Sequence, residues 1–184
     1  HLTDTLRYVG PTVLAGLLEA VSAKPVEKAV DLGCGSGLSG LELRRFARHL
    51  TGVDLSEAML ERARARSVYD VLHRAEIVSW LEHGPDDFGI AMAADVTSYL
   101  GDLAPFFLAV SKALAPGGLL AMTVHEQTAG DFGIVEGETY SHSRAFVERT
   151  ASLAGLQIDH LERGAMREEN KQPLPTLFLL LSKI

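Results

Sequence analysis

The hydrophobic positions of this chain of 184 residues follow two alternating patterns. Short apolar runs are typical of strands buried on both faces, and they predict strands over 26–32, 49–54, 69–74, 88–94, 119–124, 156–161 and 176–183. Between these runs, apolar residues recur every three or four positions, as along one side of a helix. This second pattern predicts helices within 1–22 and over 38–48, 57–66, 77–82, 103–114 and 144–154.

The order of these segments predicts an α/β fold with a doubly wound, mostly parallel, Rossmann-like sheet and helices on both faces. No helical pattern separates the last two predicted strands, so we expect an antiparallel strand near the C-terminal end. The length suits a single domain spanning 1–184, with an N-terminal helical cap over 1–22 and a cofactor-binding α/β core over 26–184. Residues 126–142 hold three glycines and no strong periodicity, which suggests a mobile flap.

Composition and charge narrow the range of partners. The formal net charge of −7 argues against nucleic acid, and the apolar runs are too short to cross a membrane. A single cysteine, Cys34, allows no internal disulfide and suits a reducing cytoplasm. The histidines lack the spacing of metal ligands, so we expect no metal. The chain begins with His1 rather than Met, which is compatible with additional domains in a longer protein.

The candidate chemistry begins in the stretch Val-Asp-Leu-Gly-Cys-Gly-Ser-Gly at 30–37. This glycine-rich turn follows a predicted strand and opens a predicted helix, where doubly wound sheets bind nucleotide-like cofactors. The glycines at 35–40 also satisfy the G-x-G-x-x-G pattern of dinucleotide sites, and Asp54 ends the next strand, where an acid binds ribose hydroxyls. However, the carboxylate of Asp31 would repel a pyrophosphate, whereas it tolerates a sulfonium cofactor that carries an amino group.

Four motifs, in the same order, resemble those of class I S-adenosylmethionine-dependent methyltransferases. The stretch at 30–37 resembles their motif I, and Thr-Gly-Val-Asp-Leu-Ser at 51–56 resembles the acidic end of their second strand. Residues 88–96 are similar to their fourth-strand motif, and Leu-Ala-Pro-Gly-Gly at 114–118 resembles the turn before their fifth strand. Softer similarities near the N-terminus and at 140–144 point to small bacterial methyltransferases associated with tetratricopeptide repeats.

This resemblance implies S-adenosylmethionine as the cofactor and S-adenosylhomocysteine as its product. It also implies contacts with the methionine part, the ribose, the adenine and the reacting methyl, in that order: Asp31, Gly33 and Gly35; Asp54; Leu55, Met59, Ala75 and Glu76; Ala94 and Asp95. Simpler roles stay open for some of these side chains. Asp54 and Asp95 could cap a helix or turn, Met59 could fill the core, and Glu76 could face solvent.

The catalytic residues stay unknown at this level. Methyl transfer depends on in-line alignment, and it needs a general base only if the acceptor arrives protonated. His125, after the fifth predicted strand, is the candidate base; Tyr99, Tyr140 and His142 are further candidates, and each could equally be structural. We therefore predict methyl transfer to a small molecule or, less favoured, a protein side chain. The alternatives are a NAD-dependent oxidoreductase and a non-catalytic S-adenosylmethionine-binding module.

Overall fold

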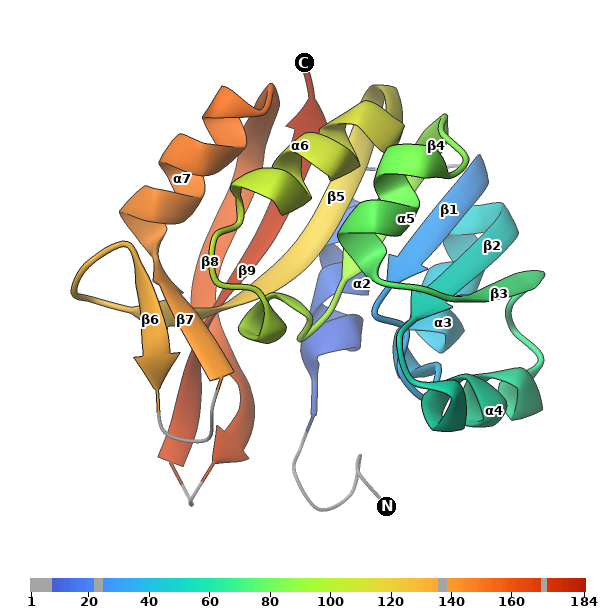
Figure 1. Ribbon diagram of the computed structural model, residues 1–184, viewed down its shortest axis with the longest axis horizontal. Coiled ribbons are helices and arrows are strands. Elements are labelled where there is room, and N and C mark those ends of the chain that lie inside the picture. Colours follow the sequence, from blue (N-terminus) through green and yellow to red (C-terminus); the bar gives the residue numbers. More distant parts are fainter. Residues whose placement is uncertain (1–7, 22–24, 136–138, 170–171) are drawn as a thin grey trace.

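The computed structural model describes residues 8–21, 25–135, 139–169 and 172–184 as a mixed sheet with helices on both faces (Figure 1). Its strands are β1 (Val26–Leu32), β2 (Ala47–Asp54), β3 (Val71–Arg74), β4 (Phe88–Ala93), β5 (Leu114–Gln127), β6 (Phe132–Val135), β7 (Thr139–Ser143), β8 (Leu156–Glu169) and β9 (Gln172–Lys183). Its helices are α2 (Gly10–Val21), α3 (Leu38–Leu43), α4 (Glu57–Arg66), α5 (Ile77–His83), α6 (Ala104–Ala113) and α7 (Arg144–Leu153), with 3₁₀ turns η1 (Arg44–Phe46) and η2 (Thr97–Tyr99). None of these helices has the length and hydropathy that a membrane span requires.

The strand order confirms the predicted fold class. Strands β3, β2, β1, β4 and β5 lie side by side in that order and run parallel. Strand β9 then pairs antiparallel with both β5 and β8, as the missing crossover helix predicted. The chain order reverses between β1 and β4, and doubly wound sheets bind ligands at the carboxyl ends of strands beside such a point. The glycine-rich turn follows β1 at this edge.

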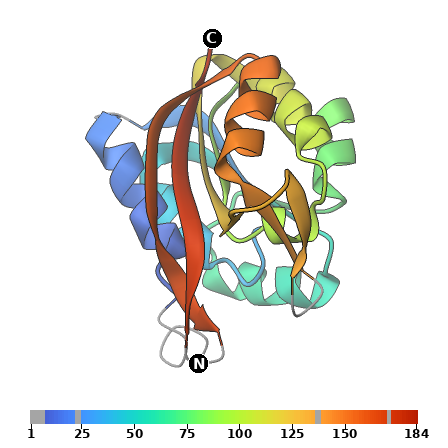
Figure 2. The same cartoon turned by 90° about the vertical axis from the view of Figure 1, so that its left-hand side faces the viewer.

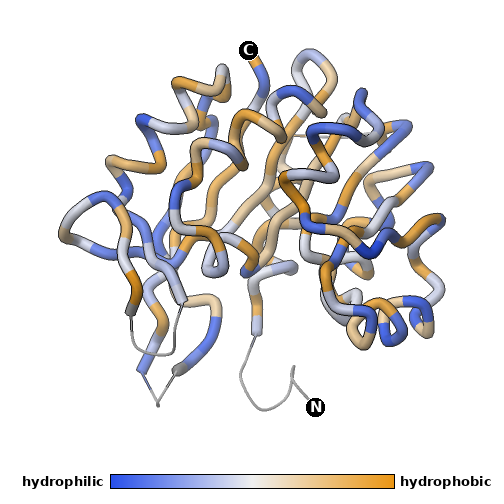
Figure 3. Tube along the Cα trace, in the orientation of Figure 1, coloured by the Kyte–Doolittle hydropathy of each residue, from blue (hydrophilic) through white to orange (hydrophobic). Residues whose placement is uncertain are grey.

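Apolar side chains bury both faces of the sheet. Helices α5, α6 and α7 cover one face, where Phe106 is fully buried, and α2 and α3 cover the other, where Leu18 is fully buried. Figure 2 shows α2 and α7 on opposite sides of the β8–β9 hairpin, and Figure 3 shows hydrophobic residues along the central strands. Neighbours within one strand, such as Ala29 and Val30, contribute to opposite faces. This two-sided burial accounts for the unbroken apolar runs.

The predicted helix over 38–48 is wrong in its second half, because α3 and η1 end before Ala47, where β2 begins. The side chain of Arg44 favours the early end. Its guanidinium donates to the carbonyls of Ala47 at 3.2 Å and Arg48 at 2.6 Å, and to Oδ2 of Asp70 at 2.6 Å. These bonds satisfy carbonyl groups that follow the helix and hold the chain in an extended path.

The predicted flap is replaced by a pair of strands. Residues 136–138 lie outside the described residues, but on either side of them β6 and β7 pair antiparallel. Strand β7 also pairs parallel with the end of β5, where Glu126 lies opposite His142. The segment therefore extends the sheet beside the carboxyl end of β5.

The last two strands are longer than predicted and form a hairpin that continues past the edge of β5. Pro173 and Pro175 were expected to lie between strands, yet both lie within β9. They pair with β8 only, because the pairing of β9 with β5 ends at Thr176. A proline is tolerated there, since the missing N–H is not needed on the unpaired side of the strand.

Candidate functional site

The glycine-rich turn after β1 contains three positions with backbone conformations that favour glycine, namely Gly33, Gly35 and Gly37. Gly33 has a φ of +68°, and a Cβ there would lie 1.9 Å from Cγ2 of Val96. Gly35 has a φ of +51°, and a Cβ there would meet nothing closer than the Gly33 carbonyl oxygen at 4.0 Å. The turn thus packs tightly against the residues after β4 at Gly33 and leaves open space above Gly35.

Asp54 joins the end of β2 to this turn. Its Oδ2 accepts the backbone N–H of Gly35 at 2.8 Å, and its Oδ1 accepts that of Ser56 at 2.8 Å. A carboxylate offers about four lone-pair positions, so each oxygen keeps capacity for another donor. The carbonyl oxygen of Asp54 accepts the N–H of Ala75 at 3.1 Å. This bond brings the loop after β3 to the same edge of the sheet.

Apolar and acidic side chains lie next to Asp54. Leu55 is apolar yet 66% exposed, and Met59 is half-buried in the first turn of α4. Glu76 caps α5, because its carboxylate accepts the N–H groups of Val78 at 2.9 Å and Ser79 at 2.7 Å. At the sequence level only a solvent-facing role stayed open for Glu76, so this capping role was not predicted, and its contact with an adenine amino group stays a prediction.

Asp31 is fully buried in β1, behind the turn. The Tyr69 hydroxyl donates to its Oδ2 at 2.6 Å, and its Oδ1 has no hydrogen-bond partner among the described residues. Burial raises the pKa of the Asp31 carboxyl to about 7, and the bond from Tyr69 opposes this rise. The ring of Tyr69 lies over Gly40, where a Cβ would come within 2.3 Å of it. Packing of Tyr69 therefore accounts for the third glycine of the G-x-G-x-x-G pattern.

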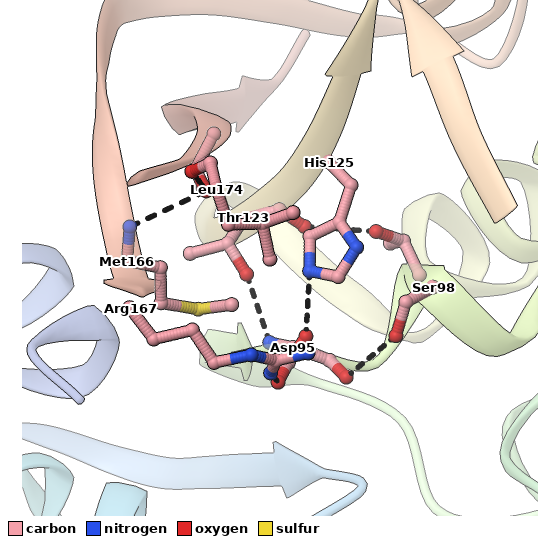
Figure 4. Close-up of polar contacts among 9 residues, drawn as sticks. Asp95, Ser98, Thr123, His125, Met166, Arg167 and Leu174 are labelled. Carbon is pink, nitrogen blue, oxygen red and sulfur yellow. Dashed lines mark hydrogen bonds and ion pairs between the residues drawn. The ribbon is translucent and has the colours of Figure 1, made fainter. Parts of the chain in front are cut away.

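Asp95 follows the buried Ala94 and holds a left-handed conformation, with φ of +60°, which is costly for a residue with a side chain. Its backbone N–H donates to Oγ1 of Thr123 at 2.8 Å, and its carbonyl accepts the Ser98 hydroxyl at 3.2 Å (Figure 4). These bonds hold the strained residue in place. The next residue, Val96, packs on Gly33, so the backbone after β4 lies close to the glycine-rich turn.

Two nitrogen-bearing side chains converge on the Asp95 carboxylate (Figure 4). Arg167, from β8, forms an ion pair with its Oδ2. His125, from β5, is only 3% exposed and places Nε2 2.9 Å from its Oδ1. The other ring nitrogen, Nδ1, is buried and has no hydrogen-bond partner within the described ranges. Tyr8 lies nearby, and burial followed by the charge of Asp95 raises the pKa of its phenol.

The other candidates from the sequence separate into exposed and structural residues. Tyr99 is the last residue of η2 and is 75% exposed. His142 is fully buried on β7, with Nε2 2.7 Å from the Gly101 carbonyl oxygen and its ring stacked on Phe146. Burial lowers the pKa of His142, which favours a neutral ring that donates to Gly101 and anchors β7. Tyr140 lies on the same strand, with its ring edge-on to Phe132. In the part of the chain that the structure describes, no group of three or more His, Cys, Asp or Glu side chains is placed to hold a metal ion.

Comparison with known proteins identifies the family. A family model described as a methyltransferase domain matches residues 30–122, about half of the chain. The chain belongs to this family. The predicted resemblance to class I S-adenosylmethionine-dependent methyltransferases is confirmed, and with it S-adenosylmethionine as the cofactor of the family and S-adenosylhomocysteine as the product.

Individual relatives agree with this assignment. The ubiquinone biosynthesis O-methyltransferase of Brucella ovis is 29% identical over 143 residues, which are 70% of this chain and 58% of that protein. The trans-aconitate 2-methyltransferase of Sinorhizobium medicae is 35% identical over 145 residues, 76% of this chain and 56% of that protein. The chain thus spans less than two thirds of these relatives. The crystal structure of magnesium protoporphyrin IX methyltransferase from Synechocystis PCC 6803 with bound SAH shares the fold, with a TM-score of 0.76, 15% identity, and coverage of 97% of this chain and 84% of that one.

The residues of this methyltransferase domain fit its cofactor. The space above Gly35 leaves room for a bound molecule, and the lone pairs of Asp54 face the same turn. Exposed Leu55 offers an apolar surface next to Asp54, and Oδ1 of Asp31 is a buried acceptor without a partner in the described residues. Of the predicted contacts, Gly33, Gly35, Asp54, Leu55, Ala75 and Asp95 lie along one edge of the sheet, whereas the Asp31 side chain lies beneath it.

Sequence reasoning missed two side chains of the candidate site. Tyr69 was placed at the start of a strand, but it precedes β3 and packs on Gly40 and Gly52. Arg167 was placed in a polar connection between strands, and it lies on β8. The glycine at position 40 was a usable signal for Tyr69, because a glycine inside a helical pattern often marks close packing. No signal in the sequence pointed to Arg167.

Proposed function

We propose that this protein transfers a methyl group from S-adenosylmethionine to a small-molecule acceptor. The observation that carries the proposal is the carboxylate of Asp54, which anchors Gly35 at 2.8 Å and keeps lone pairs for two ribose hydroxyls beside an open glycine turn. The family assignment supports methyl transfer. The relatives named for ubiquinone biosynthesis and for trans-aconitate support a small-molecule acceptor.

In this proposal different residues at the carboxyl ends of the strands bind different parts of the cofactor. Asp54 holds the ribose, Leu55 and Met59 pack on the adenine, and Glu76 accepts from its amino group. Asp31, Gly33 and Gly35 line the methionine part. When bound, the cofactor supplies a sulfonium methyl, which forms a bond to the acceptor while the carbon–sulfur bond breaks and its electron pair stays on sulfur. Ala94 and Asp95 border the point of transfer, so alignment of the acceptor there provides most of the rate.

The acceptor side of the proposed site contains one pair suited to proton transfer. Nε2 of His125 lies 2.9 Å from Asp95, and a carboxylate in this position orients an imidazole. A hydroxyl acceptor that arrives protonated would pass its proton to this pair, whereas an ionised acceptor needs no base.

We also propose a cytoplasmic location and a single domain over 1–184. Its cap helix, α2, lies over the face of the sheet that α3 also covers. Residues 1–7 and 22 of the proposed cap lie outside the described residues.

Calorimetric titration with S-adenosylhomocysteine and, separately, with NADH tests the proposed cofactor. We expect saturable binding of S-adenosylhomocysteine only. Asp54→Ala should weaken this binding by about a hundredfold, since it removes the ribose acceptor and the anchor of Gly35. Asp70→Ala is the matched control, because Asp70 also accepts a backbone N–H beside a strand, that of Leu50 at 2.7 Å, but lies outside the proposed site. Binding of NADH alone, or an Asp54 variant that binds as tightly as the parent, contradicts the proposal.

A further inference from the structure

The acceptor side of the proposed site, at the carboxyl ends of the strands, contains an arginine, Arg167, with free hydrogen-bond donors toward the described residues. Arg167 carries five N–H donors, yet its single hydrogen bond to a described residue runs from Nη1 to Asp95. Its side chain is 22% exposed, so the remaining donors lie in a mostly desolvated position that is still open to a ligand. A guanidinium in such a position binds a carboxylate with two parallel hydrogen bonds more readily than it faces water.

A β-bulge in β8 sets the direction of the Arg167 side chain. The pairing of β8 with β9 shifts register between Ala165 and Glu168, which inserts an extra residue on β8. Such bulges redirect side chains next to functional sites. Met166 is fully buried against Gly10, and its carbonyl accepts the N–H of Val9 at 3.1 Å. The bulge is therefore fixed from the opposite side, while Arg167 reaches across to the end of β4.

An unpartnered polar atom next to Arg167 also indicates a ligand. Nδ1 of His125 is buried without a hydrogen-bond partner in the described part of the chain, whereas its Nε2 and Oδ1 of Asp95 face each other 2.9 Å apart. Buried polar atoms are nearly always satisfied in folded proteins, so a molecule at this position would restore the missing bond. Because Arg167 balances the charge of Asp95, the groups that remain for a ligand are mainly hydrogen-bond donors.

We propose that Arg167, assisted by the ring N–H of His125, binds a carboxylate group of the methyl acceptor. Asp95 acts as a positioning residue that keeps the guanidinium at the edge beside Gly33. This inference rests on the proposed function, because it assigns the acceptor class of that same site.

The test uses matched pairs of probes on the protein saturated with S-adenosylhomocysteine: benzoate and benzamide, salicylate and salicylamide, 4-hydroxybenzoate and 4-hydroxybenzamide, and fumarate and fumaramide. We expect at least one carboxylate to bind ten times or more tightly than its amide. Arg167→Gln should abolish this preference, and Arg167→Lys should restore part of it, since it keeps the charge without the planar fork. Arg163→Gln is the matched control, because Arg163 also lies on β8 and pairs with a carboxylate, that of Glu126, but is 63% exposed.

Two readouts separate this inference from the proposed function. Binding of S-adenosylhomocysteine should be unchanged in all three variants, which also reports that they fold. Loss of that binding in the parent protein would overturn the proposed function itself. Equal binding of every carboxylate and its amide, no binding of any probe, or an unchanged preference in Arg167→Gln would overturn only the carboxylate site. Tighter binding of the amides than of the carboxylates would likewise overturn it.

Discussion

At the level of the residue, the buried carboxylate of Asp31 makes the stability of the fold depend on pH. Its carboxylate is fully buried and receives one hydrogen bond, from Tyr69. Because burial raises the pKa of Asp31 to about 7, the folded protein binds more protons than the unfolded chain between about pH 4 and pH 7. This contribution to stability is therefore complete below the unfolded pKa and is lost as the pH rises toward 7.

The corresponding experiment compares Asp31→Asn with the parent protein in urea unfolding at several pH values, without cofactor. We expect the free energy of unfolding of the parent to fall as the pH rises from 5 to 7, by at most about 1.4 kcal/mol per pH unit. Asp31→Asn should remove this fall and be the more stable protein at pH 8. Asp70→Asn serves as the control, because the N–H of Leu50 lowers the pKa of Asp70, and that variant should keep the fall. Parallel curves for the parent and Asp31→Asn would exclude Asp31 as the source.

At the level of the element, two glycines in helices make opposite predictions. Gly40 lies in α3, where a Cβ would come within 2.3 Å of the Tyr69 ring, whereas Gly16 lies in α2, where a Cβ would meet nothing within 4 Å. Gly40→Ala should therefore destabilise the protein by about 1–3 kcal/mol through overpacking. Gly16→Ala should stabilise it by about 0.5–1 kcal/mol, because alanine favours a helix.

Thermal unfolding of both glycine variants, with and without Tyr69→Ala, checks this assignment. If Tyr69 is the obstacle, Gly40→Ala should cost much less in the Tyr69→Ala background, while the effect of Gly16→Ala should add independently. An equal cost of Gly40→Ala in both backgrounds would show that another contact fixes this glycine.

Elements with strong local signals were predicted from the sequence, and those that depend on distant partners were not. The helix over 57–66 was predicted to its ends, because Ser56 caps it with its own side chain. The helix over 38–48 was too long, because its end depends on Arg44 and on Asp70, which lies far along the chain. In the site, Asp54 was found from a motif within one strand and turn. Arg167 joins it from β8 through a register shift, and no pattern along a single segment encodes such a shift.

At the level of the whole molecule, the two faces of one sheet should unfold together. The core on each face is built on the same strands, as the neighbours Ala29 and Val30 show. Trp80, the single tryptophan, packs against Phe88 on the α5 side, with ring centroids 6.1 Å apart. Leu18 is fully buried in α2 on the opposite face. A substitution at Leu18 should therefore change the unfolding transition seen by Trp80 fluorescence only if both faces of the sheet unfold together.

We predict that Leu18→Ala lowers the free energy of unfolding by about 2–5 kcal/mol and shifts the denaturation midpoint equally in Trp80 fluorescence and in far-UV circular dichroism. Leu41→Ala is the control, since Leu41 lies in α3 on the same side but is 49% exposed. By either probe, it should change the free energy of unfolding by less than about 0.5 kcal/mol. If Leu18→Ala moves the circular dichroism transition but leaves the Trp80 transition in place, the two faces unfold separately. The single domain proposed over 1–184 would then be wrong, and the edge that carries Asp54 and Asp95 would be stabilised by one face alone.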